Sequence, residues 1–462
     1  MPGGIVFCME LKSGLVRRNS GKKGRNIMIR EWKAIVMAGK NDGSVVEGKP
    51  ICLSQLLGMP VIQYVLDALK EAGAREICVL SSEDLEEYEK VLGRQEGIRY
   101  LKGKKRNTPA KDAGFFDSLE EDVVMVSANT PLLQAEEIRD LVRVHQEHGN
   151  AATYYMPEAG ARTPVMSHDH GFCFCFRANY LADALDAVSK YAATNILTRV
   201  VADGGRAEQR IKPECGAFDI IRNRVQMAAV LKKLQIRINE KHMMEGVMIM
   251  SPETTYITPH TVIGKNTLIY PGTYLEGHTT IGENCVIGPN SRLVSSNVKE
   301  GAEIAYSTVL ESEIGAETHV GPYAYVRPGS RIGNKAKIGD FVEIKNSNIG
   351  NETKISHLTY VGDADVGECV NFGCGTVVVN YDGVHKHRTV IENDAFIGCN
   401  TNLVSPVHVA EGAFTAAGST ITEDVPAKSL AIARARQVNK EDWISPKQKE
   451  REQKEQEGMA CI

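Results

Sequence analysis

The stretch that decides the fold runs from Val262 to Gly288 and reads Val-Ile-Gly-Lys-Asn-Thr-Leu-Ile-Tyr-Pro-Gly-Thr-Tyr-Leu-Glu-Gly-His-Thr-Thr-Ile-Gly-Glu-Asn-Cys-Val-Ile-Gly. An aliphatic residue recurs at every sixth position, and glycine often follows it. With phase slips, the series comprises Ile263, Ile269, Leu275, Ile281, Ile287, Leu293, Ile314, Val320, Val326, Ile332, Ile338, Ile344, Ile391, Ile397, Leu403 and Val409. A fixed hexapeptide period predicts a parallel β-helix, whereas short antiparallel strands would not keep this phase.

In a β-helix of this kind, three six-residue sides make one coil, and the aliphatic residues stack inward. With coils ~4.8 Å apart, the roughly nine coils between Val262 and Val425 would make a prism about 40 Å long. The phase slips predict loops that leave the coil, above all Tyr381–Thr389. We assign residues 246–436 to this domain and the charged residues 437–462 to a solvated tail.

Upstream of this domain, apolar runs alternate with helical patterns. The runs predict strands at 34–38, 77–80 and 123–126 and helices at 60–71 and 85–92. Such alternation predicts a parallel βαβ sheet, which binds ligands at the carboxyl ends of its strands. We expect residues 28–221 to form a Rossmann-like α/β domain that binds a nucleotide. A long helix at 222–245 would link it to the prism, and residues 1–27 would be a basic extension, disordered or arising from a mis-assigned start.

Composition excludes several classes of protein. The 462 residues are 42% hydrophobic and 24% charged with a net charge of −4, which is typical of a globular protein without a global field for nucleic acid. The longest apolar runs fall far short of the ~20 residues that a membrane helix needs. The eleven cysteines lack C-x-x-C spacing, which argues against a zinc site or disulfide frame and for a reducing cytoplasm. Cys173-Phe-Cys175, between aromatic neighbours, predicts buried thiols in a strand.

Two motifs suggest phosphate chemistry. Gly43-x-x-x-x-Gly48-Lys49 follows the first strand, but Pro50 stands where a phosphate-binding loop needs a magnesium-binding hydroxyl, so a glycine-rich βα loop is favoured over an ATPase. In the β-helix, cations and polar groups gather within one stretch of coils, where they could hold a phosphate monoester around a histidine able to act as a general base. They are Arg327, Lys345, Lys354, His357, Tyr360, Asn371, Asn380 and Lys386. A three-histidine zinc site is disfavoured, since a single residue separates His385 from His387 on a loop and nothing marks a companion carboxylate or a third ligand.

Four stretches carry a resemblance to a known family: His357-Leu-Thr-Tyr-Val-Gly-Asp363, Asn371-Phe-Gly-Cys-Gly-Thr376, Asn380-Tyr-Asp-Gly383 with Lys386, and Leu430-Ala-Ile-Ala-Arg434-x-x-Gln437-x-x-Lys440-Glu-x-Trp443. The chain resembles the GlmU family, bifunctional N-acetylglucosamine-1-phosphate uridylyltransferases and glucosamine-1-phosphate N-acetyltransferases. The layout matches from Trp32 to Trp443 and densely after Pro322. The resemblance implies a left-handed β-helix that forms a homotrimer and acetylates glucosamine-1-phosphate from acetyl-CoA between neighbouring subunits.

By motif match, the resemblance also implies residue roles. His357 would take the proton from the sugar amine, and the Cys374 N–H would face the thioester carbonyl as an oxyanion donor. Sugar-phosphate contacts would be Arg327, Lys345, Tyr360, Asn371, Asn380, Tyr381 and Lys386. Acetyl-CoA contacts would be Cys374, Cys399, Ala417 and Arg434. Cys374 and Cys399 replace an alanine and a small hydroxyl residue of the family, and packing is favoured over covalent catalysis because direct amine attack needs no enzyme-bound intermediate.

The resemblance implies a nucleotidyltransferase-like fold for residues 28–221, but this half departs from the family pattern. Residues 39–44 lack its arginine, and Lys49-Pro50 inverts its Pro-Lys order. Asn107-Thr108-Pro109-Ala110 stands for the family's Gly-Thr-Gly-His-Ala. Asn129 replaces the aspartate of the magnesium motif, and Asn223 falls at the second metal position. Magnesium prefers charged carboxylate oxygen, so these amides should weaken the metal site.

We therefore expect an acetyltransferase of UDP-N-acetylglucosamine biosynthesis, serving peptidoglycan and cell wall, with a degenerate uridylyltransferase half. Acetyl-CoA is the co-substrate, and magnesium is needed only if the N-terminal half is active. Two alternatives stay open: a fully bifunctional enzyme that also uses UTP, and a non-catalytic sugar-nucleotide sensor.

Overall fold

The structure is a computed structural model that describes residues 29–38, 45–46, 49–81, 85–102, 120–157, 172–187, 193–212 and 215–456. The chain divides into two compact units, Met1–Val230 and Leu231–Ile462. The predicted extension 1–27, the loop 39–44 and the motif 107–110 lie outside the described residues.

The first unit is built on a seven-stranded sheet in the order β11-β9-β10-β8-β1-β6-β7. The strands are β1 (Trp32–Ala38), β6 (Glu76–Ser81), β7 (Ile98–Lys102), β8 (Asp122–Ser127), β9 (Ala152–Pro157), β10 (Cys173–Arg177) and β11 (Ala207–Lys212). The three predicted strands are confirmed as β1, β6 and β8, which pair in parallel. The predicted βαβ core is thus parallel, and the sheet as a whole is mixed, because β10 runs antiparallel to β8 and β9. A short run buried on both faces has the same apolar pattern in either direction.

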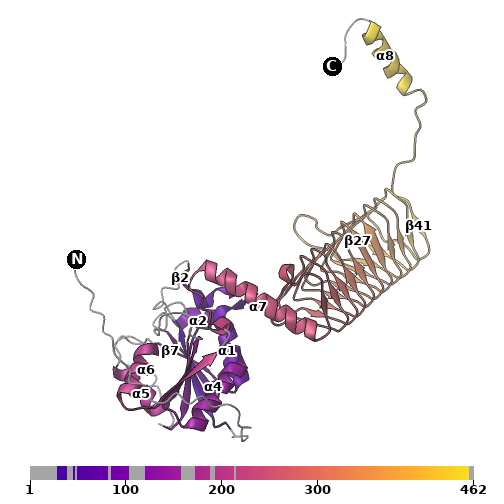
Figure 1. The fold of residues 1–462 in the computed structure, drawn as a ribbon. Helices are drawn as coiled ribbons and strands as arrows, with labels where there is room; N and C mark the ends of the chain where they lie inside the picture. Colours follow the sequence, from indigo (N-terminus) through magenta and orange to yellow (C-terminus); the bar gives the residue numbers. More distant parts are fainter. Residues whose placement is uncertain are drawn as a thin grey trace. The chain divides into compact units, whose positions relative to one another are not determined.

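Helices cover both faces of this sheet (Figure 1). Successive strand residues point to opposite faces, so Ala34 and Val36 pack with α1, α2 and α4, whereas Ile35 packs with α5 and α6. These helices are α1 (Val61–Ala72), α2 (Leu85–Leu92), α4 (Ala135–His148), α5 (Ala178–Ala187) and α6 (Ala193–Ala202). The long helix α7 (Arg224–Met244) follows them and contains the boundary between the two units. The shorter elements are β2 (Val45–Val46), β3 (Lys49–Pro50), β4 (Gln55–Leu56), β5 (Met59–Pro60), η2 (Ile51–Leu53), η3 (Cys215–Phe218) and η4 (Pro252–Thr254). Cys173 and Cys175 are buried in β10, as predicted, and the predicted long helix is α7.

The second unit is a left-handed parallel β-helix with three sheets, as predicted. Its first sheet contains β12 (Met248–Ile249), β15 (Leu268–Ile269), β18 (Val286–Ile287), β21 (Glu303–Ile304), β24 (His319–Val320), β27 (Lys337–Asp340), β30 (Lys354–His357), β33 (Asn371–Phe372), β36 (Phe396–Ile397), β39 (Phe414–Thr415) and β41 (Leu430–Ala431). Its second contains β13 (Tyr256–Ile257), β16 (Tyr274–Glu276), β19 (Arg292–Val294), β22 (Thr308–Leu310), β25 (Tyr325–Val326), β28 (Glu343–Lys345), β31 (Tyr360–Gly362), β34 (Val377–Val379), β37 (Asn402–Val404) and β40 (Thr420–Ile421). Its third contains β14 (Val262–Ile263), β17 (Thr280–Ile281), β20 (Asn297–Val298), β23 (Glu313–Ile314), β26 (Arg331–Ile332), β29 (Asn348–Ile349), β32 (Ala364–Val366), β35 (Thr389–Ile391) and β38 (His408–Val409).

The aliphatic residues of the six-residue series fill the interior of this prism, and all of them are buried. Close stacking of the coils demands glycine at some positions: a Cβ on Gly339, within β27, would lie 1.9 Å from the carbonyl oxygen of Ser356 in the next coil. The predicted loop is confirmed, since residues 380–388 leave the coil between β34 and β35.

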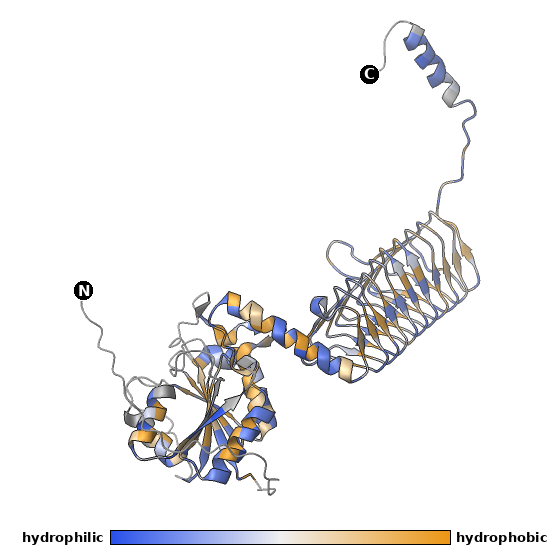
Figure 2. Cartoon of the chain, viewed as in Figure 1, coloured by the Kyte–Doolittle hydropathy of each residue, from blue (hydrophilic) through white to orange (hydrophobic). Residues whose placement is uncertain are grey.

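The last described element is α8 (Ile444–Gln456), in the segment predicted to be a solvated tail. Its residues are almost entirely hydrophilic (Figure 2). None of the helices in the described part of the chain combines the length and the apolar character needed to cross a bilayer.

Candidate functional site

One edge of the prism, between the first and second sheets, aligns residues from successive coils. Pairing of β27 with β30 places Asp340 beside His357. The registers of β30 with β33, β33 with β36 and β36 with β39 continue the alignment to Cys374, Cys399 and Ala417. We call these five residues the edge row. Arg434 lies beside its end, because a Cβ on the residue after Ala417 would lie 3.8 Å from the Arg434 Cδ.

His357 is oriented by its neighbour in the edge row. Its Nδ1 lies 2.5 Å from Oδ1 of Asp340, and its side chain is 57% exposed. This hydrogen bond is the main cause that holds the pKa of Asp340 below its usual value. An ionised carboxylate only accepts hydrogen bonds, so Nδ1 of His357 donates and a neutral ring keeps the lone pair of Nε2 available. The pair therefore has the geometry of an oriented general base.

Three cations gather at the ends of second-sheet strands and on the 380–388 loop, on the coils around Asp340 and His357. Arg327 donates to Glu343 at 2.8 Å, which is the main cause that raises the pKa of the guanidinium. Lys386 comes from the 380–388 loop and lies beside the Lys345 ammonium, whose proximity lowers the pKa of Lys386. Two ammonium groups facing each other favour an anion between them. We call Arg327, Lys345 and Lys386 the cation cluster.

Asp363 holds Lys345 of the cation cluster in place. Its Oδ2 accepts from Lys345 Nζ at 3.0 Å and from Asn380 Nδ2, and its Oδ1 accepts from Asn346 Nδ2 at 2.6 Å. Its side chain is only 9% exposed. Burial acts to raise the pKa of Asp363, but the hydrogen bonds outweigh it and the pKa is lowered. Asp363 thereby fixes the positions of Lys345 and Asn380, two of the predicted contacts.

Tyr360 adds a phenol to the same place. Its hydroxyl lies over Gly362, where a Cβ would come within 2.3 Å of it, so a larger residue at this strand end would displace the Tyr360 ring. Burial acts to lower the pKa of Lys345, but Asp363 raises it, and the nearby Tyr360 contributes in the same direction. The structure therefore brings Arg327, Lys345, Tyr360, Asn380 and Lys386 together.

The loop that carries Lys386 is braced by Asp382. Its Oδ1 accepts the backbone N–H groups of Val384 at 2.7 Å and His385 at 2.6 Å, and its Oδ2 lies 2.7 Å from His387 Nε2. The His385 N–H, followed by the His387 ring, lowers the pKa of Asp382 to about 2. Tyr381, which is exposed, donates its hydroxyl to the Gly383 carbonyl at 2.6 Å. These contacts hold the loop in one conformation.

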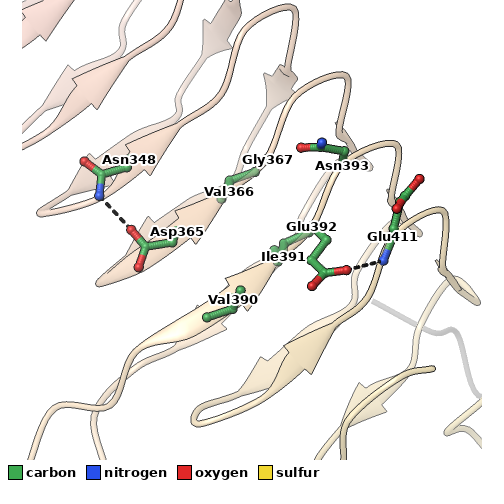
Figure 3. A pocket seen from close by; sticks show the side chains of 9 residues that line it. All are labelled: Asn348, Asp365, Val366, Gly367, Val390, Ile391, Glu392, Asn393 and Glu411. Carbon is green, nitrogen blue, oxygen red and sulfur yellow. Dashed lines mark hydrogen bonds between the residues drawn. The ribbon is translucent and has the colours of Figure 1, made fainter. Parts of the chain in front are cut away.

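Other predicted residues are not brought into the cluster within this chain. Asn371 lies on the first sheet, paired with Lys354 and Phe396. A groove of about 510 Å³ lies on the third sheet (Figure 3) and contains none of the predicted site residues. It is lined by Asn348, Asp365, Val366, Gly367, Val390, Ile391, Glu392, Asn393 and Glu411. Its three carboxylates disfavour a phosphate, so the cation cluster is the better anion site.

The two candidate metal positions of the first unit lie near each other. The Ile221 N–H donates to the carbonyl of Asn129, which is buried just after β8, and Asn223 follows two residues later. Asn223 accepts the Gln226 N–H at 2.9 Å and so caps α7. Both side chains are neutral amides, and the described residues contain no group of three or more His, Cys, Asp or Glu side chains placed to hold a metal. Within the described residues, the donors do not fit a magnesium site.

The sequence matches known proteins along most of its length. Residues 260–294 and 311–346 match the bacterial transferase hexapeptide family, and residues 388–423 match the hexapeptide repeat of succinyl-transferase. The bifunctional protein GlmU of Acetivibrio thermocellus is 38% identical over 459 residues, covering 91% of this chain and 99% of that protein. The chain belongs to the GlmU family. A second GlmU, from Clostridium perfringens, is 39% identical over 450 residues, covering 90% of this chain and 98% of that protein.

Membership of the GlmU family agrees with the resemblance drawn from the motifs, and the alignment with the Acetivibrio GlmU is long enough to include both units. Among solved structures, a UDP-N-acetylglucosamine acyltransferase of Francisella novicida matches with a TM-score of 0.31 at 17% identity. That match covers 40% of this chain and 67% of the other.

Proposed function

We propose that the chain transfers the acetyl group of acetyl-CoA to the amine of glucosamine-1-phosphate, a step in UDP-N-acetylglucosamine synthesis. The observation that carries the proposal is the placement of the Asp340–His357 pair on the same coils as the cation cluster. The cluster supplies the positive charge that a phosphate monoester needs, and the oriented imidazole supplies a base for the amine.

In the proposed mechanism, the phosphate binds Arg327, Lys345 and Lys386, which places the sugar amine near His357. The amine attacks the thioester carbonyl while Nε2 of His357 takes its proton. The Cys374 N–H faces the oxygen that gains negative charge. The C–N bond forms, the C–S bond breaks, and the leaving CoA thiolate takes the proton from His357.

Acetyl-CoA would lie along the edge row from Cys374 to Ala417, with Arg434 available to its phosphates. We further propose a homotrimer, in which a neighbouring copy completes the site. Asn371 and Tyr381 would then contact substrate held between subunits. Asn371 lies on the first sheet, away from the cation cluster of its own chain, whereas Tyr381 pairs with Lys386 on the 380–388 loop. Sedimentation tests this point, since a monomer at working concentration would contradict a shared site.

For the first unit we propose that uridylyl transfer is lost, because Asn129 and Asn223 offer no charged oxygen to magnesium. A fully bifunctional enzyme is the second candidate, favoured by the family membership across both units. Release of pyrophosphate from UTP and N-acetylglucosamine-1-phosphate in the presence of magnesium would support the second candidate.

The phosphate-binding role of the cluster has a direct test. We would measure the rate of CoA release with glucosamine-1-phosphate and with glucosamine, in the native chain and in Lys386→Ala. The native chain should prefer the phosphorylated sugar strongly, and Lys386→Ala should lose most of that preference. Lys299→Ala, an exposed lysine on an early coil, is the matched control and should behave as the native chain. Equal rates with both sugars would contradict the proposal.

A further inference from the structure

Two cysteines occupy consecutive places in the edge row. The pairing of Asn371 with Phe396 and of Phe372 with Ile397, continued by two residues, puts Cys374 beside Cys399. The Asn400 N–H donates to the Cys374 carbonyl at 2.8 Å, and the Gly418 N–H donates to the Cys399 carbonyl at 2.8 Å, so the two turns stack in phase. In-register residues on neighbouring coils are ~4.8 Å apart, within the Cα separation of about 4.4–6.8 Å that a disulfide spans.

Both thiols are accessible, unlike most cysteines that the structure describes. Cys399 is exposed and Cys374 is partly exposed, whereas Cys52, Cys78, Cys173, Cys175 and Cys285 are buried. Both are free thiols. Peroxide reacts with accessible cysteines, and a sulfenic acid is resolved most readily by a thiol held next to it.

Cys369 provides an internal comparison. It is exposed, but its N–H donates to the Asn351 carbonyl, which places it at a different corner of the prism, before β33. The registers of β33 with β30 and with β36 put Glu352 and Asp394 beside it. Cys369 therefore has carboxylates rather than a thiol as its in-register neighbours.

We propose that Cys374 and Cys399 form an oxidation site that peroxide converts into a disulfide. The thiolate of Cys399 attacks one peroxide oxygen, the O–O bond breaks, and hydroxide leaves and is protonated to water. The other thiol then attacks the resulting sulfenic sulfur, the S–S bond forms, and a second water leaves. Two thiols and one hydrogen peroxide thus give one disulfide and two waters, and an external dithiol reverses the change.

The consequence for activity rests on the proposed function. The disulfide would join two coils in the middle of the edge row, between His357 and Ala417, where acetyl-CoA is proposed to lie. It would draw the two side chains together across that row and hinder the thioester from reaching His357. Oxidation should therefore cause a reversible loss of acetyl transfer, and bound acetyl-CoA should slow the formation of the disulfide.

The test uses the full chain, treated with hydrogen peroxide, quenched in acid and digested without reductant for mass spectrometry. We expect linked peptides containing Cys374 and Cys399, two hydrogens lighter than the reduced pair, and their loss after dithiothreitol. Cys369→Ser should form the same link, whereas Cys374→Ser should leave Cys399 as a sulfenic acid that dimedone traps. Oxidation of Cys369 before any link appears, or oxidation of both thiols without a link, would overturn the proposal.

Acetyl transfer measured on the same samples separates the two claims. If the reduced enzyme is active, and oxidation both forms the link and removes the activity, both claims are supported. A link in a protein that never acetylates glucosamine-1-phosphate supports the oxidation site and contradicts the proposed function. Acetyl transfer without a link supports the proposed function and contradicts the oxidation site.

Discussion

Replacing Asp363 by Asn should lower both the stability of the β-helix and its affinity for the sugar phosphate. All three partners of the carboxylate, Lys345, Asn346 and Asn380, present donors to it. An amide keeps the shape but turns one of its own N–H donors toward a donor. Asn also tolerates the left-handed backbone of this position, where φ is 50°, so the change isolates the charge.

A hydrogen bond to a charged group contributes about 1.5–3 kcal/mol, and the Asp363 side chain is nearly buried, so we expect a loss of about 2 kcal/mol in the free energy of unfolding. In a unit of this size, that corresponds to a fall of roughly 4–8 °C in the unfolding midpoint, measured by calorimetry on the full chain. The KM for glucosamine-1-phosphate should rise more than kcat falls, because Lys345 loses its anchor. Glu313→Gln, which weakens an exposed pair with Arg331 at 3.9 Å, is the control and should change neither quantity.

The effect of Asp363→Asn should depend on pH with a definite sign. The folded pKa of Asp363 is lowered, so its carboxylate contributes stability above the unfolded value of about 3.9. That contribution is lost as pH falls through the folded pKa. The difference between native and variant midpoints should be constant from neutral pH down to about pH 5 and should vanish at lower pH. A midpoint within 1 °C of the native value at neutral pH, together with an unchanged KM, would refute the anchoring role.

Three further outcomes are expected. His357→Ala should reduce acetyl transfer by about 10²–10⁴-fold, the usual contribution of a general base, while the unfolding midpoint stays nearly unchanged because the side chain is more than half exposed; unaltered turnover would remove His357 from the mechanism. Asp382→Asn should raise the KM for glucosamine-1-phosphate with little change in kcat, since the brace that presents Lys386 is weakened; steady-state kinetics that match the native chain would contradict this role. Asn129→Asp alone should not produce pyrophosphate from UTP, and robust release by this variant would show that the changes in residues 39–50 matter less than we infer.

Much of the fold could be predicted from the sequence, because the β-helix places one aliphatic residue in its core at every sixth position. Every aliphatic residue of the series from Ile263 to Val409 is buried, and the phase slips interrupt the count without moving a member of the series out of the core. The antiparallel course of β10 could not be predicted, since Cys173–Arg177 is buried on both faces and an apolar run carries no sign of strand direction.

The site was predicted in part. Motifs marked the cations and His357, but they gave no role to the carboxylates that orient them, namely Asp340, Glu343 and Asp363. A signal for these was present in the sequence. Neighbouring coils repeat after 16 to 18 residues, and each acid stands that far from the cation or histidine it contacts, as for Asp340 with His357 at a spacing of 17 residues. Counting along the sequence by one whole coil, instead of by six residues, would have paired each acid with the cation or histidine that it contacts.

The most direct test of the central claim is the release of CoA by the purified full chain on mixing acetyl-CoA with glucosamine-1-phosphate, followed by addition of UTP and magnesium with detection of pyrophosphate. We predict rapid CoA release, which identifies an acetyltransferase, and no pyrophosphate, which leaves the first unit without uridylyl transfer. Pyrophosphate release would contradict our interpretation of Asn129 and residues 39–50. Absence of CoA release would contradict the account of the edge row and the cation cluster as a catalytic site.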